Sequence, residues 1–106
     1  MDNFQANLRK LPGISHLTGL RLLAPDGEEV GWIENKSGSQ GALAVYNHVA
    51  QIYGAITPDA ARKALELFAE HCEDARANPG RHPNIDRLFV LIAENRTLRV
   101  KHVFAV

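Results

Sequence analysis

The segment from Thr57 to Ala75 constrains the fold more than any other part of the chain, because it carries a complete helix signature. Thr57 can cap the helix, Pro58 suits the first helical position, and Asp59 complements the helix dipole. Apolar residues then recur at helical spacing and form one stripe: Ala61, Ala64, Leu65, Phe68, Cys72 and Ala75. The pattern predicts a single amphipathic helix that Asn78-Pro79-Gly80 brings to an end.

Two strand-like segments precede this helix and are joined by a turn sequence. Leu20–Ala24 and Val30–Ile33 are apolar segments of strand length. Between them, Pro25-Asp26-Gly27 supplies a fixed φ, a local side-chain acceptor and a residue that tolerates positive φ. The arrangement predicts a β-hairpin. Ahead of it we expect a short helix over about Asn3–Lys10, which Pro12-Gly13 ends.

A second pair of strand-like segments lies near the end of the sequence. Leu88–Ala93 is an almost continuous apolar run, which is typical of a strand covered on both faces. Glu94–Thr97 resembles a tight hairpin turn in which Asn95 tolerates positive φ. The next segment alternates, and one of its faces consists of Leu98, Val100, His102 and Phe104. These features predict a second hairpin.

One more helix is expected between the first hairpin and Thr57, entered from the polar loop Asn35–Gly41. Its apolar face consists of Ala42, Val45, Tyr46, Val49, Ile52 and Tyr53. Asn47 falls on the opposite face and is expected in water, and Gly54 suits the C-cap.

Strands and helices therefore come in separate runs rather than in strand–helix–strand alternation. This order predicts an α+β fold, in which two β-hairpins form a mainly antiparallel four-stranded sheet with helices packed on one face. The length of 106 residues suits a single domain, residues 1–106.

Composition limits the class of partner and the compartment. Twelve basic and twelve acidic residues cancel, so electrostatics gives no reason to expect a nucleic-acid or membrane partner. The one cysteine cannot form an intrachain disulfide, and no apolar stretch approaches the length of a membrane span. We expect a cytoplasmic protein.

Chemistry-bearing side chains are concentrated at the end of the Thr57 helix and in the loop that follows. His71 and Asp74 share one flank of the helix, and the Pro79-Gly80 turn could bring His82 and Asp86 to the same flank. Two imidazoles and two carboxylates would suit a divalent metal such as zinc. The leading hypothesis is therefore a site for a divalent metal or a small polar ligand.

The same segment offers groups for a ligand and for catalysis. Arg76, Arg81 and Asn84 could bind an anionic or polar group. His71 and His82 could transfer protons, which makes metal-assisted or histidine-mediated hydrolysis or isomerisation the reaction class to consider. Whether the protein is an enzyme stays open at this point.

Other readings of these residues exist. Asp74 and Asp86 could be ordinary turn residues, and the Pro79–Asp86 loop could be a structural clasp in a non-enzymatic, homodimeric interaction module. The edge Leu98–Val106 could pair with a second copy, so a homo-oligomer is expected. We interpret His102 as a core histidine and Lys36–Gly41 as an ordinary loop, although such a loop can bind an anion.

Two segments of the chain, Asn35–Asn47 and Ala69–Leu88, resemble domain of unknown function 2322, a family of short uncharacterised bacterial proteins. The likeness runs over nearly the whole chain, and the second segment is the more specific. The resemblance implies a bacterial origin, a free-standing single domain and no established activity. It implies no catalytic residues.

Overall fold

Helices and strands alternate unevenly along the chain in the computed structural model, which describes residues 2–106. The elements are α1 (Phe4–Leu8), β1 (Leu17–Leu23), β2 (Glu29–Glu34), α2 (Gln40–Tyr53), α3 (Pro58–Phe68), α4 (His71–Ala77), α5 (Pro83–Ala93) and β3 (Arg99–Phe104). Within the described residues the fold is therefore α+β with five helices. None of the helices in this range is long and apolar enough to cross a membrane.

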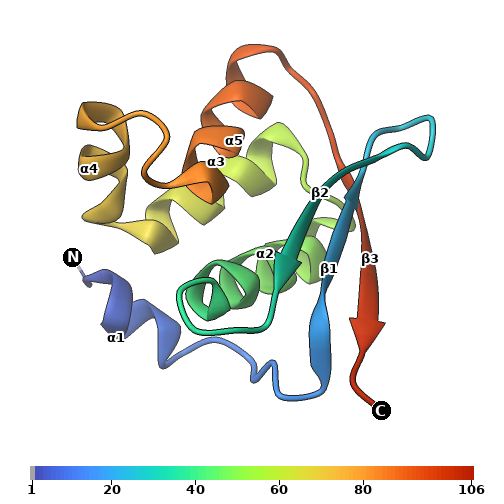
Figure 1. The fold of residues 1–106 in the computed structure, drawn as a ribbon. Coiled ribbons are helices and arrows are strands. Elements are labelled where there is room, and N and C mark those ends of the chain that lie inside the picture. The colour runs from blue at the N-terminus through green and yellow to red at the C-terminus, as the bar shows by residue number, and fades with distance from the viewer. Residues whose placement is uncertain (1) are drawn as a thin grey trace.

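The sheet has three antiparallel strands in the order β2-β1-β3, with β1 in the centre. β1 and β2 form the expected hairpin, and β3 returns from the end of the chain to pair with the other side of β1 (Figure 1). The predicted four-stranded sheet built from two hairpins is wrong. The helices gather on one side of the sheet, and α2 packs against β1 and β2.

The fourth strand is missing because Leu88–Ala93 belongs to helix α5. Ile85, Leu88 and Leu91 are buried at helical spacing, whereas Val90 is exposed. A short apolar run fits either a buried strand or a helix face, so the run alone could not decide between them. Pro83 at the first helical position is the local signal for a helix. Asn95 has φ 52°, as expected, but it follows a helix and not a strand.

The long helix predicted from Thr57 is divided at Ala69, which has φ 52° and separates α3 from α4. The start was predicted correctly, since the Thr57 hydroxyl accepts a hydrogen bond from the Ala60 amide at 3.0 Å. The carbonyl groups at the end of α3 find new donors: Asn7 Nδ2 donates to Leu67 O at 3.0 Å. The break is therefore stabilised by contacts from outside the helix.

The polar face expected for α2 is also wrong at one position. Asn47 is 1% exposed, because β3 covers it and His102 Nε2 lies 2.8 Å from its Oδ1. Ile52 and Tyr53, expected to be buried, are exposed at the end of the helix. Gly54 caps α2 with φ 81°, as predicted.

Candidate functional site

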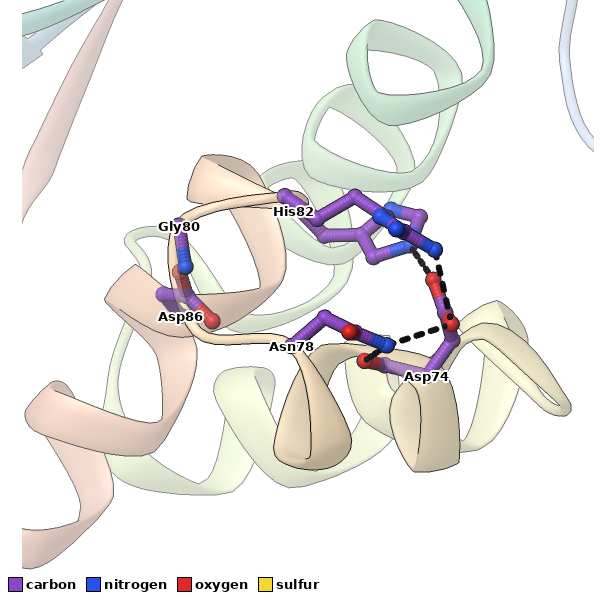
Figure 2. Close-up of polar contacts among 6 residues, drawn as sticks. Asp74, Asn78, Gly80, His82 and Asp86 are labelled. Atoms are coloured by element: carbon purple, nitrogen blue, oxygen red, sulfur yellow. Dashed lines mark hydrogen bonds and ion pairs between the residues drawn. The ribbon is translucent and has the colours of Figure 1, made fainter.

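Asp74 is the centre of the hydrogen-bond network that holds the loop between α4 and α5. Its Oδ2 lies 2.6 Å from His82 Nε2, and the two side chains point toward each other (Figure 2). Its Oδ1 accepts from Asn78 Nδ2 at 3.0 Å and from Arg81 Nη1 at 3.3 Å. Asp74 thus binds three residues of the loop that follows its own helix.

A second carboxylate holds the same loop from the other side. Asp86, in the first turn of α5, accepts a hydrogen bond at 2.9 Å from the backbone N–H of Gly80 (Figure 2). Gly80 has φ 94°, a conformation that favours glycine and lets the chain reverse after Pro79. Together the two carboxylates fix the path of residues 78–86.

The contact between Asp74 and His82 also indicates which nitrogen of the His82 ring carries the shared proton. The hydrogen bond with His82 is the main cause that lowers the pKa of Asp74, and the charge of Arg81 acts in the same direction. An ionised carboxylate can only accept hydrogen bonds, so the shared proton lies on His82 Nε2. In the neutral ring, Nδ1 then keeps a lone pair and can accept a proton, as in a general base oriented by a carboxylate.

Helix α1 lies beside these histidines. The Phe4 ring stacks on Phe68, with centroids 5.5 Å apart, and meets the His71 ring edge to face at 4.8 Å. The His71 and His82 ring centroids are 5.6 Å apart. The Phe4 amide donates to Glu70 Oε1 at 2.8 Å, which ties α1 to the start of α4 and lowers the pKa of Glu70.

A pocket of about 780 Å³ opens between these groups and the loop before α2. One part of its wall is the segment from Lys36 to Ala42, and another is Arg81–Ile85. The remaining wall comes from α1, Phe68 and His71. The pocket thus joins the two segments that the sequence marks as distinctive, the loop before α2 and the loop before α5.

Gly41 allows α1 to approach this wall closely. A Cβ atom at Gly41 would lie 2.7 Å from the Phe4 ring, closer than real Cβ contacts come. The glycine therefore brings the start of α2 against the aromatic ring that lines the pocket.

The predicted site residues fall into three groups. His71, Arg81, His82 and Asn84 line the pocket, whereas Asp74 and Asp86 hold the loop from outside it. Arg76 lies elsewhere, with its guanidinium 4.8 Å from the centre of the Phe89 ring. His102 is half-buried and bonds Asn47 at the helix–sheet interface.

The geometry gives no support to a metal centre. Within residues 2–106, no group of three or more His, Cys, Asp or Glu side chains is placed to hold a metal ion. Asp74 and Asp86 instead accept hydrogen bonds from their own loop. Metal binding, by zinc or another divalent ion, stays a prediction from sequence.

Sequence reasoning missed Phe4 and set aside Lys36–Gly41, although both line the pocket. Phe4 follows Asn3, whose side chain caps α1 by accepting from the Ala6 amide, and nothing local links it to His71. For Lys36–Gly41, the glycines and the lysine are the sequence features that could have indicated a binding loop.

Comparison with known proteins gives one match. The family described as "Uncharacterized protein conserved in bacteria (DUF2322)" matches residues 4–102. No curated protein and no solved structure matches the chain.

Proposed function

The chain belongs to the DUF2322 family of uncharacterized proteins conserved in bacteria, and we propose that its pocket binds a small polar ligand that carries negative charge. The observation that carries this proposal is the charge of the lining. Lys36 and Arg81 line the pocket together with His71 and His82, and no Asp or Glu side chain is among the lining residues. Such a lining attracts a carboxylate or phosphate group and repels a cation.

The loop network supports this role because it determines which charges face the pocket. Asp74 and Asp86 accept hydrogen bonds from the loop outside the pocket lining. Asp74 holds Arg81 and His82, which contribute to the lining, and Asp86 holds the adjacent Gly80 through its backbone N–H. Asp74 thus positions the guanidinium and imidazole groups from behind the wall, and its carboxylate offsets part of the Arg81 charge.

The start of α2 is compatible with an anion as well. Ser39 makes no side-chain cap, and the first turn contains no acidic residue. The backbone N–H groups at a helix start carry partial positive charge and lack partners within the helix. In α2 the Gln40 N–H already donates to Lys36 O at 3.0 Å, so the N–H groups of Gly41 and Ala42 are the ones that an anion can use. They add to the attraction that Lys36 and Arg81 provide.

Isothermal titration calorimetry with inorganic phosphate tests the proposal. We expect saturable binding that falls at least about tenfold in a Lys36→Gln, Arg81→Gln double variant, because two charges near the anion are lost. The matched control is Arg62→Gln, Lys63→Gln, which removes one arginine and one lysine from exposed ion pairs on α3. Absent binding to the wild type, or equal binding to both double variants, would contradict the proposal.

A homodimer is a second candidate, favoured by the free edge of the sheet. β3 is an outer strand, and Phe104 at its end is 63% exposed. Unpaired strand edges with apolar residues can pair with another chain. Sedimentation velocity over a wide concentration range should then show a dimer that a Phe104→Arg variant loses. A monomer at every concentration would exclude this candidate.

A further inference from the structure

Aromatic rings form a continuous row along one part of the pocket wall. Phe68 stacks on Phe4 with an interplanar angle of 14°. Phe4 meets His71 at 81°, and His71 lies at 42° to His82. All four rings line the pocket. The row draws on α1, on the end of α3, on α4 and on the start of α5, so the tertiary fold assembles it from four places in the sequence.

Hydrogen bonds and burial hold this row in place. Phe4 is fixed through its amide to Glu70 at 2.8 Å, and His82 is fixed through Nε2 to Asp74 at 2.6 Å. Phe68 is almost fully buried. A pre-organised surface of this kind loses little freedom when a ligand binds, so its shape can select one class of ligand over another.

The pocket therefore presents two kinds of group to one ligand. The cationic groups, Lys36 and Arg81, attract a negative charge. The Phe4, His71 and His82 rings present partly apolar faces and edges at steep angles to one another. Aromatic groups favour one another in offset or edge-to-face arrangements, so these rings can pack around a planar group. The volume of about 780 Å³ is that of a pocket for a metabolite-sized molecule rather than for a bare ion.

Resting on the proposed anion pocket, we infer that the ligand carries a planar aromatic group beside its negative charge, and that the partly exposed rings of Phe4, His71 and His82 select this group. The buried Phe68 supports Phe4 from behind. The ligand class is thus an aromatic or heteroaromatic phosphate or carboxylate. Phe4 and His71 act as specificity residues, because they occupy the middle of the row.

Three probes that share one charged group test the inference: inorganic phosphate, phenyl phosphate and cyclohexyl phosphate. Calorimetry with the wild-type chain should show phenyl phosphate binding about fivefold or more tightly than inorganic phosphate. Cyclohexyl phosphate has a similar apolar body without a planar ring, so its affinity should exceed that of inorganic phosphate by a clearly smaller factor. Equal affinity for the phenyl and cyclohexyl esters would overturn the inference, since any apolar body would then suffice.

Variants of two residues in the row provide a second test. Phe4→Leu keeps apolar volume and removes the ring, so the ratio of phenyl phosphate to inorganic phosphate affinity should fall toward one. If Phe4→Leu loosens α1 and weakens phosphate itself, His71→Leu tests the same ratio from α4. An unchanged ratio in both variants overturns the inference.

The two proposals fail in different ways. If inorganic phosphate and both esters fail to bind the wild type, the anion pocket itself is wrong. If phosphate binds and phenyl phosphate binds no more tightly, the anion pocket is supported and only the proposed selection for an aromatic group is wrong.

Discussion

The Oδ2 atom of Asp74 lies 2.6 Å from Nε2 of His82, and this contact joins α4 to the start of α5 across a turn. Both residues had been candidates for a metal shell. The structure uses Asp74 to orient His82 and Arg81, and only the latter two line the pocket. The loop is thus held by hydrogen bonds to Asp74 and Asp86, and it forms one wall of the candidate site.

The Asp74 contact makes stability depend on pH in a defined direction. The pKa of Asp74 is lowered in the folded protein, first by the hydrogen bond with His82. The unfolded chain therefore binds this proton more tightly, so Asp74 contributes stability above its ordinary pKa of about 3.9. This contribution is lost as the pH falls through the lower folded-state value.

We expect Asp74→Asn to be less stable than the wild type at neutral pH and to lose less stability on acidification. Urea midpoints measured from neutral to strongly acidic pH compare the two proteins. Glu66→Gln, in an exposed pair with Lys63, serves as the control. Parallel pH profiles for the wild type and Asp74→Asn would contradict the assigned contact.

The break between α3 and α4 predicts a stabilising substitution. Ala69 has φ 52° and ψ −120°, a conformation that costs a residue with a Cβ atom but not glycine. Ala69→Gly should raise the free energy of unfolding by about 1 kcal/mol. Ala77→Gly, at the exposed last residue of α4, replaces an alanine without positive φ, so it should bring no gain in the free energy of unfolding. Chemical denaturation measures both, and a loss of stability in Ala69→Gly would contradict the observed break.

Tyr46 links α2 to the start of α5, and removal of its hydroxyl should lower stability. Its buried hydroxyl donates to the Asn84 carbonyl at 2.7 Å and accepts from Arg87 Nη1 at 3.2 Å. Burial is the main cause that raises the pKa of Tyr46 to about 12. Tyr46→Phe should lower the free energy of unfolding by about 1–2 kcal/mol, because both partners lose a hydrogen bond.

Tyr53→Phe is the matched control for that loss, since Tyr53 lies on the same helix with 41% of its surface exposed. It should change stability by less than about 0.5 kcal/mol. Similar unfolding curves for the two variants would show that the Tyr46 hydroxyl makes no such bonds.

The predictions that came true rest on local signals. The hairpin over Pro25-Asp26-Gly27, the cap at Thr57 and the end of α2 at Gly54 each depend on a few neighbouring residues. The meeting of Asp74 and His82 was also within reach, because only a short turn separates them.

The predictions that were wrong or missing concern features that depend on contacts between distant segments. The apolar run at Leu88–Ala93 fits a strand or a helix equally well until its neighbours are known. Alanine favours helices, so Ala69 gives no sign of the break that follows. Phe4 reaches Glu70 and His71 through the folded chain, and no pattern in the sequence links them.

The proposed anion site lies between the loop before α2 and the loop before α5. Two-dimensional ¹H–¹⁵N NMR with inorganic phosphate tests it most directly, since each backbone amide reports separately. We predict saturable shifts concentrated in residues 36–42 and 81–85, apart from Pro83, with β3 unaffected. Shifts spread over the exposed lysines and arginines, or no saturable shifts, would contradict the claim.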